Sequence, residues 1–137
     1  MLKKRSGGHT YPPVVSIERI AMKREQVEGD LRDGQRLTLA EYLAWPEDDR
    51  FMELIDGVLY MSPSPAGWHQ DIGSRLHSLL DRWTIAHALG RVWQDLDVIL
   101  CEAPAIVYRP DIVYLAKQHM ERNRNHRIYG PADLCVE

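Results

Sequence analysis

The chain has 137 residues, of which 45% are hydrophobic and 27% are charged, and its formal net charge is −3. A chain of this length is expected to fold as one domain with its own core. The small negative charge excludes a polycation that binds nucleic acid through charge alone. No apolar run is long enough to span a membrane and no secretory signal opens the chain, so we expect a cytoplasmic protein without a membrane partner.

Residues 1–36 are expected to form an N-terminal extension. Its stretch RSGGHTYPP is punctuated by glycine and proline, which predicts a partly flexible chain. The following VSIERIAMKREQVEGD places apolar residues roughly on one side of a possible helix. We therefore divide the chain into this extension and a domain that covers residues 37–137.

The domain is predicted to open with a short helix and a hairpin. Thr38 and Glu41 have the spacing of a capping box, and Pro46 forbids the helix to continue. In FMELIDGVLYM, two apolar runs flank Asp56-Gly57, which is the strongest short-range signal of a tight turn. The SPSP that follows is expected to be a stiff, extended loop.

A long helix is predicted from about Trp68 to Leu89, where Gly90 supplies a C-terminal stop. Apolar residues recur in it at helical spacing. They are Ile72, Leu76, Leu79, Leu80 and Trp83. We expect the tryptophans of the chain to lie mainly in the core or where this helix docks, with the alternative for Trp68, beside the SPSP loop, of an exposed ring that stacks on a base.

Three further strands are predicted, in RVWQDLDVILC, IVYRPDIVYL and ADLCVE. Asp95 and Asp97 alternate with apolar residues in the first, so we expect them on its solvated face, with a place in a metal site as the minor alternative. Pro110 interrupts the second and indicates a bulge or a strand start there. The order of the elements predicts an α/β or α+β fold with a mixed sheet. Cys101 and Cys135 lie in apolar runs, and we expect both to be buried free thiols.

Three carboxylates stand in otherwise apolar runs: Glu53, Asp111 and Glu137. Each alone has a simple structural explanation: an exposed hairpin position, a cap at a strand start, or an exposed residue on an edge strand. Together they suggest another role, because a buried carboxylate is costly unless it is paired or bound to a metal. Oxygen ligands at strand ends, with open positions for water, suit Mg²⁺, which can hold a phosphate and activate water.

The segments LTLAEYLAWPEDDRFMELIDGVLYMSPSPAGWHQDIGSRLHSLL, RPDIVYL and GPADLCVE, in this order, resemble the Uma-two family of restriction endonucleases in the PD-(D/E)XK nuclease superfamily. The resemblance covers Leu37 to the C-terminal residue. It implies a restriction-endonuclease-like mixed β-sheet flanked by helices and preceded by a β-hairpin. It also implies phosphodiester hydrolysis that depends on Mg²⁺ or Mn²⁺.

Matched residue by residue, the resemblance makes Asp111 the aspartate of the PD half-motif and Glu137 the acidic residue of the second half-motif. Glu53 matches an acidic residue of the first hairpin and is a third candidate metal ligand. His69 matches a histidine at the start of the long helix, where a phosphate contact, a hydrogen bond to Glu53 and a capping role are all open. The resemblance thus implies a catalytic group of Asp111, Glu137, Glu53 and His69.

One feature departs from the family pattern. The family continues after this glutamate with a helix that carries a lysine, whereas this sequence stops at Glu137. We interpret the chain as a fragment or a truncated relative, weakly active or inactive as an endonuclease. The alternative function is a non-catalytic module that binds nucleic acid or mediates assembly on the same fold.

The expected partners are DNA and a second copy of the chain. A basic run beside the predicted metal site could follow a phosphate backbone. Its residues are Lys117, Arg122, Arg124 and Arg127. A homodimer is expected because the last strand and an apolar face would otherwise be left uncovered.

Overall fold

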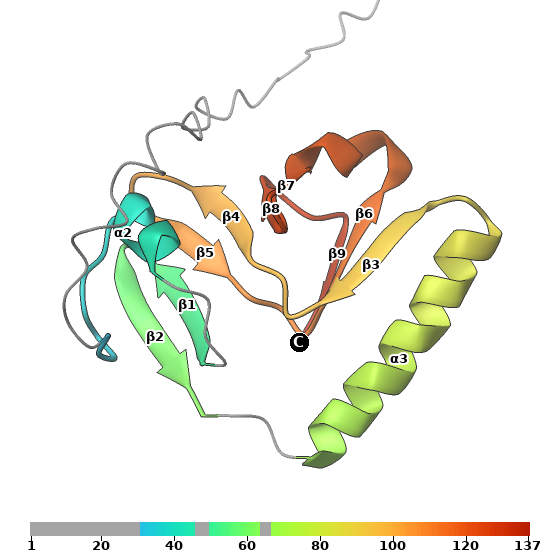
Figure 1. Cartoon of the computed structure of the whole chain (residues 1–137), viewed down its shortest axis with the longest axis horizontal. Helices are drawn as coiled ribbons and strands as arrows, with labels where there is room; N and C mark the ends of the chain where they lie inside the picture. The colour runs from blue at the N-terminus through green and yellow to red at the C-terminus, as the bar shows by residue number, and fades with distance from the viewer. Residues whose placement is uncertain (1–30, 46–49, 64–66) are drawn as a thin grey trace, which may run out of the picture.

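The computed structural model describes residues 31–45, 50–63 and 67–137, which form two β-sheets and two α-helices. Figure 1 shows the sheets converging at one end, close to the C-terminal residue, while α3 lies beside the smaller sheet. The mixed sheet and the helices confirm the expected fold class. The possible helix in the extension and Pro46 lie outside the described residues, although Leu31 already packs in the core.

The larger sheet has six strands in the order β2-β1-β5-β4-β8-β7. Their bounds are β1 Phe51–Ile55, β2 Val58–Ser62, β4 Val98–Cys101, β5 Ile106–Tyr108, β7 Asn123–Arg124 and β8 Arg127–Tyr129. All neighbours pair antiparallel except β4 and β8, which pair parallel. The predicted hairpin is confirmed as β1 and β2, in which Asp56 and Gly57 turn the chain with φ of 51° and 75°. Such positive φ angles explain why the turn uses Asp-Gly.

The smaller sheet has three antiparallel strands in the order β3-β6-β9. They are β3 Gly90–Gln94, β6 Ile112–Ala116 and β9 Leu134–Val136. The last strand was expected from ADLCVE and is confirmed, at the edge of this sheet among the described residues. Cys135 is exposed there and Cys101 is half-buried, so the prediction of two buried thiols was wrong. Cys135 lies in an edge strand, which has a neighbouring strand on one side only and therefore leaves its side chains more exposed.

Two of the predicted strands are each divided between the two sheets. RVWQDLDVILC becomes β3 and β4, separated at Asp95, which adopts a left-handed φ of 51°. IVYRPDIVYL becomes β5 and β6, separated at Arg109–Asp111. The central residue of that break is Pro110, which has no amide hydrogen for a ladder. The prediction of one unbroken strand was therefore wrong for RVWQDLDVILC, whereas the break in IVYRPDIVYL falls where Pro110 indicated a strand start. Both breaks fall where the sheets meet.

The short helix α2 spans Leu39–Ala44, and its capping box is confirmed. The side chain of Thr38 accepts a hydrogen bond from the amide of Glu41, whose carboxylate accepts one from the amide of Thr38. Leu39, Tyr42 and Leu43 of α2 are buried in a core with β1, β2 and β5. A second core cluster contains Val98 of β4, Val113 and Leu115 of β6 and Ile128 of β8.

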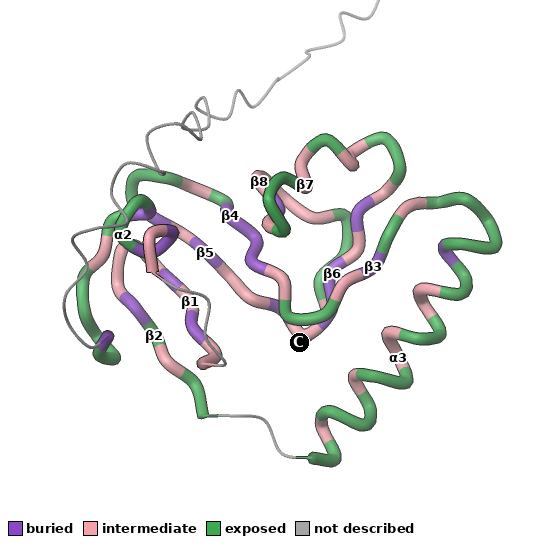
Figure 2. The backbone as a smooth tube through the Cα atoms, viewed as in Figure 1, coloured by how far each residue is buried: buried purple, intermediate pink, exposed green. Residues whose placement is uncertain are grey.

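The long helix α3 spans Gly67–Ala86 and contacts β3. All its residues are described, and only Thr84 is buried. Part of its apolar stripe is exposed: the exposed fractions are 58% for Ile72, 58% for Leu79 and 57% for Trp83, whereas Leu76 and Leu80 are half-buried. Trp68, in the first turn, is 69% exposed. Figure 2 shows the helix largely exposed. The expectation that Trp83 lies in the core or at the docking contact was wrong, because the helix contacts β3 along a neighbouring face. Trp68 is exposed, which is the alternative considered for it from the sequence. None of the described helices is long and apolar enough to cross a membrane.

Candidate active site

Asp111 and Glu137 lie at the same end of neighbouring strands. Asp111 immediately precedes β6 and Glu137 immediately follows β9. The two strands pair antiparallel with Ile112 opposite Val136, so one further step of this register sets Asp111 opposite Glu137. Residues opposite each other on antiparallel strands point to the same face of the sheet. This end of the smaller sheet thus carries two carboxylates side by side.

Asp95 extends this row onto the third strand. It directly follows β3, and its amide donates a hydrogen bond to the carbonyl of Asp111 at 3.3 Å. Burial raises the pKa of Asp95, and the negative charge of Asp111 raises it further. From the sequence, a place for Asp95 in a metal site was only the minor alternative to a solvated position, because alternation with apolar residues does not show which side chains meet. The row Asp95, Asp111 and Glu137 follows from the pairing of strands that are distant in sequence.

Glu53 approaches this row from the larger sheet. It lies on β1, and its Oε1 accepts a hydrogen bond from the amide of Arg109 at 3.0 Å. The pKa of Glu137 is raised, first by burial and then by the charges of Glu53 and Asp111. The structure therefore brings both Glu53 and Asp111 within electrostatic reach of Glu137, at the junction of the sheets.

His69 lies in the first turn of α3 and contacts Asp111. Its Nε2 is 2.8 Å from Oδ2 of Asp111, and the two side chains are 39% and 25% exposed. The ring of Trp68 lies edge-on to the imidazole, with the ring centroids 6.1 Å apart. The sequence left a hydrogen bond from His69 to Glu53 as one possibility. In the structure His69 contacts a carboxylate, but it is that of Asp111. This contact fixes one oxygen of Asp111 and leaves the other available.

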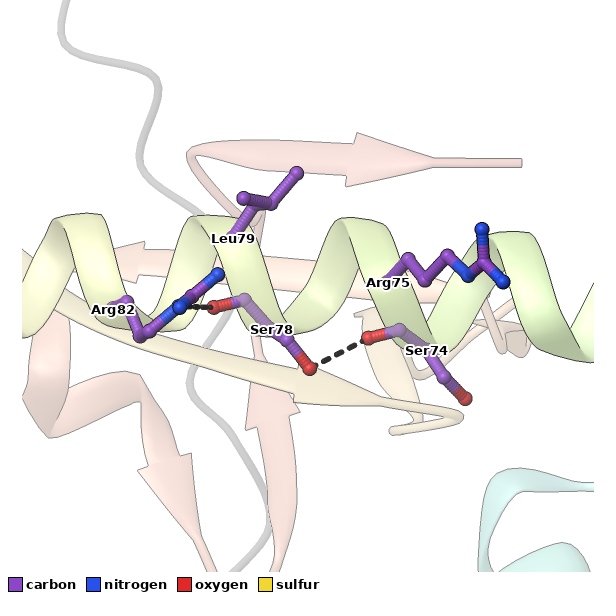
Figure 3. Close-up of a pocket in the computed structure, with 5 residues that line it drawn as sticks. All are labelled: Ser74, Arg75, Ser78, Leu79 and Arg82. Carbon is purple, nitrogen blue, oxygen red and sulfur yellow. Dashed lines mark hydrogen bonds between the residues drawn. The ribbon is translucent and has the colours of Figure 1, made fainter.

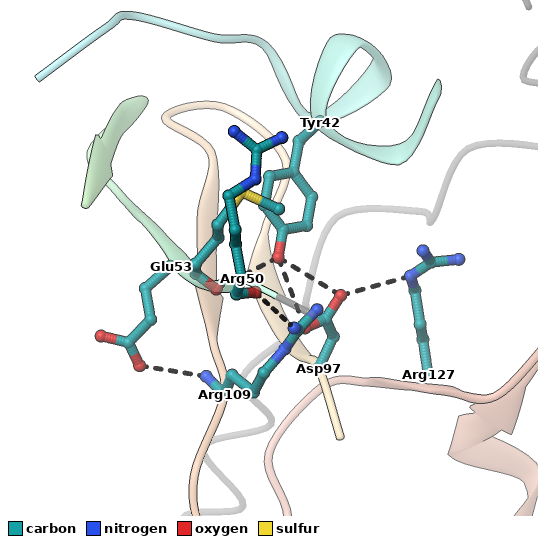
Figure 4. A network of polar contacts seen from close by, with 7 residues as sticks. Tyr42, Arg50, Glu53, Asp97, Arg109 and Arg127 are labelled. Carbon is teal, nitrogen blue, oxygen red and sulfur yellow. Dashed lines mark hydrogen bonds and ion pairs between the residues drawn. The ribbon is translucent and has the colours of Figure 1, made fainter. Parts of the chain in front are cut away.

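A buried polar network around Asp97 lies next to Glu53 at the junction of the sheets (Figure 4). Asp97 is 4% exposed and accepts from Nε of Arg109 at 2.8 Å and from Nε of Arg127 at 3.3 Å. The hydroxyl of Tyr42 lies 3.4 Å from both carboxylate oxygens of Asp97 and 3.3 Å from the carbonyl of Met52. The expectation of a solvated Asp97 was therefore wrong: the break after β3 turns this residue inward between two arginines.

The charges of this network are stabilised mutually. Burial is the largest effect on the pKa of Arg109 and would lower it, but the bond and charge of Asp97 more than offset burial, and the pKa is raised. The pKa of Tyr42 is also raised, first by burial and then by the charge of Asp97. Tyr42 is therefore a neutral hydroxyl, and Asp97 and Arg109 form an ion pair.

The predicted basic set is not a single free surface. Arg127 pairs with Asp97, and a guanidinium nitrogen of Arg122 donates to the carbonyl of Pro131 at 2.7 Å. Nε of Arg124 donates to the carbonyl of Glu121 at 3.1 Å. Lys117 is exposed at the start of the 3-10 helix η1, which spans Lys117–Arg122. Arg124 and Lys117 are the more exposed members of the set.

A separate hollow of about 400 Å³ lies along α3, away from the carboxylates (Figure 3). Its lining residues are Ser74, Arg75, Ser78, Leu79 and Arg82. Nε of Arg82 donates to the carbonyl of Ser78, and the hydroxyl of Ser78 donates to the carbonyl of Ser74. The hollow contains no carboxylate and is distinct from the junction.

The carboxylates at the junction match the chemistry of a hard divalent cation, which prefers oxygen ligands and retains water. In the described part of the chain, no three His, Cys, Asp or Glu side chains lie close enough to enclose a metal ion. Asp111 and Glu137 are the best placed pair, because they lie opposite each other and because the charge of Asp111 raises the pKa of Glu137. The residues fit an ion held by two carboxylates and several waters, with Glu53 beside them.

Comparison with known families decides the lineage. Residues 39–137 match the family model described as "Uma2: Putative restriction endonuclease". The chain belongs to the Uma2 family. This Uma2 match confirms the resemblance drawn from the sequence motifs, and it includes Glu53, His69, Asp111 and Glu137.

A solved structure supports the Uma2 assignment. The chain is similar to a putative nuclease of the DUF820 group from Anabaena variabilis, with 25% sequence identity and a TM-score of 0.57. The match covers 69% of this chain and 52% of the other, so this Uma2 chain spans about half the length of that nuclease. No curated protein matches the chain.

Proposed function

We propose that this Uma2 domain hydrolyses phosphodiester bonds of DNA with Mg²⁺ or Mn²⁺ as cofactor. The observation that carries the proposal is the register of β6 and β9, in which Asp111 and Glu137 are opposed next to the charge of Glu53. Clustered carboxylates with raised pKa values are typical of sites that bind cations or transfer protons. Membership of the Uma2 family supports nuclease chemistry over other metal-dependent reactions.

Each residue has a separate task in this proposal. Asp111 and Glu137 hold the cation, and Glu53 is the auxiliary ligand. The cation supplies charge stabilisation for the phosphate and a more acidic bound water. His69 orients Asp111 through the 2.8 Å contact, so it acts on the ligand and not on the substrate. Lys117 and Arg124 are the exposed cations that we assign to the phosphate backbone.

One observation favours the alternative, a non-catalytic module that binds nucleic acid or mediates assembly. Lys117 is the only lysine among the described residues, and it follows β6, whereas Asp111 precedes the same strand. Six residues of extended chain separate the two by about 20 Å. Lys117 therefore does not reach the carboxylates to stabilise charge in the transition state. We accordingly propose weak cleavage or none for this chain by itself.

A homodimer is the second part of the proposal. The exposed part of the apolar stripe of α3, which consists of Ile72, Leu79 and Trp83, and the edge strand β9 both support association with a second copy. A dimer would present two candidate sites to the two strands of a duplex.

A plasmid-nicking assay tests the function. The chain is incubated with supercoiled DNA and Mg²⁺ or Mn²⁺, beside Asp111→Ala and a control with a metal chelator. We expect slow nicking that disappears with the chelator and in Asp111→Ala. If binding to DNA survives without any metal-dependent nicking at high protein concentration, the alternative function is supported. Nicking that is unchanged in Asp111→Ala would refute the assigned residues.

A further inference from the structure

Arg109 is held through both its main chain and its side chain, between the two sheets (Figure 4). Its amide donates to Oε1 of Glu53 at 3.0 Å. Its guanidinium donates to Oδ1 of Asp97 at 2.8 Å and to the carbonyl of Arg50 at 3.3 Å. The side chain is 19% exposed, and that of Asp97 is 4% exposed. A charge-assisted hydrogen bond between such buried groups restricts the guanidinium more than a surface ion pair does.

The restriction extends along the chain to Asp111. Only Pro110, which is buried, separates Arg109 from Asp111. The proline ring fixes its own φ and also limits the backbone of the residue before it. An Arg109 that is fixed by Asp97 therefore limits where the backbone of Asp111 lies. The amide of the same arginine limits where the carboxylate of Glu53 lies.

We propose that Arg109, anchored by Asp97, is a positioning residue that sets the separation of Glu53 and Asp111 for a divalent cation. The inference rests on the proposed function and goes beyond it, because it assigns a role to an arginine side chain that binds neither metal nor substrate. Glu53 comes from the larger sheet and Asp111 from the smaller one. Arg109 connects the two, because its amide donates to Glu53 and it lies two residues before Asp111.

The direction in which the affinity for a divalent cation changes when Arg109 is replaced distinguishes positioning from simple electrostatics. The guanidinium carries a positive charge near the carboxylates: burial and Asp111 raise the pKa of Asp95, and Arg109 opposes them. If charge alone mattered, removal of this guanidinium would strengthen the binding of a cation, because it would remove a repulsion. Positioning has the opposite consequence, since misplaced ligands bind a cation more weakly.

The test measures Mn²⁺ binding to the full chain by electron paramagnetic resonance of the free ion. Arg109→Gln is compared with Arg127→Gln, a matched control that loses an ion pair with the same Asp97 but belongs to β8. We expect Arg109→Gln to weaken Mn²⁺ affinity by about 10-fold, as is usual for groups that orient metal ligands. Arg127→Gln is expected to change it by less than about 3-fold. Thermal melts followed by circular dichroism establish that each variant is folded.

An Mn²⁺ affinity that is unchanged or stronger in Arg109→Gln overturns the inference, and so does an equal loss in the two variants. Arg109→Lys provides a second measurement if Arg109→Gln fails to fold. It keeps the charge but loses the planar group that reaches two partners, so we expect an affinity about 3-fold to 10-fold weaker. An unchanged affinity in Arg109→Lys also overturns the inference. Asp111→Ala separates the two proposals: if it binds Mn²⁺ as tightly as the wild type, the proposed function itself is wrong.

Discussion

Where the sheets meet, Asp95 lies near the charge of Asp111, and Glu137 lies near the charges of Glu53 and Asp111. Burial is the main cause of the raised pKa values of Asp95 and Glu137, and neighbouring carboxylates raise them further. A carboxyl group with a raised pKa binds its proton more tightly in the folded state than in the unfolded state. The contribution of this group to the stability of the fold is therefore present at low pH and lost as pH rises through the folded pKa.

This sign leads to a prediction about Mg²⁺ and pH. Above its raised pKa, Glu137 is ionised beside the charges of Glu53 and Asp111. Millimolar Mg²⁺ should therefore raise the melting temperature more at about pH 7 than at about pH 4, where glutamate is largely protonated. Circular dichroism melts measure the difference. Glu137→Gln removes one ligand and should respond less to Mg²⁺ at the higher pH. An equal Mg²⁺ effect at both pH values would contradict a carboxylate site.

A second prediction concerns the buried ion pairs. Asp97→Ala leaves Arg109 and Arg127 without their shared carboxylate, and the loss of one partner of a buried pair costs about 3–5 kcal/mol. Urea unfolding measures this free energy. Asp95→Asn is the control, because the side chain of Asp95 is exposed and asparagine also tolerates its left-handed φ of 51°, so stability should change by less than about 0.5 kcal/mol. Similar losses in the two variants would show that the network does not stabilise the fold.

At the scale of the elements, α3 shows what helical periodicity predicts and what it leaves open. The spacing from Ile72 to Trp83 predicts the helix and the existence of an apolar stripe, but not which partner covers the stripe. In the structure the helix docks through the neighbouring face that contains Thr84. The junction was likewise beyond prediction, because an apolar run that passes from one sheet into another has the sequence of a single strand. Only Pro110 marked a possible break.

The stripe of α3 provides a prediction about association. Leu79→Lys places a charge in the stripe and should shift the chain towards monomer, while the free energy of unfolding changes by less than about 0.5 kcal/mol because Leu79 is 58% exposed. Light scattering after size-exclusion chromatography measures the mass. Ile85→Lys is the matched control, since Ile85 is 66% exposed but lies on another face of the helix. A wild type that stays monomeric up to millimolar concentration would refute the homodimer.

At the scale of the whole molecule, the candidate site lies where two sheets converge, and each sheet contributes ligands. Glu53 comes from β1 of the larger sheet, and Asp111 and Glu137 flank strands of the smaller one. The order of motifs from the hairpin to the last strand predicted the family, because such an order is far more specific than any single motif. The convergence of the carboxylates required the register of β6 and β9, which no local sequence pattern contains. Asp97 and Arg109 were missed for the same reason: each is recognisable only from its partner.

The most direct test of the central claim is a crystal structure of the chain with Mn²⁺, located by its anomalous scattering. We predict one Mn²⁺ between Asp111 and Glu137, with carboxylate oxygens at roughly 2.0–2.6 Å and water in the remaining positions. The oxygens of the two residues that face the ion would then lie within about 4–5 Å of each other. An Mn²⁺ bound only elsewhere, or Asp111 and Glu137 pointing to opposite faces of the sheet, would contradict the account.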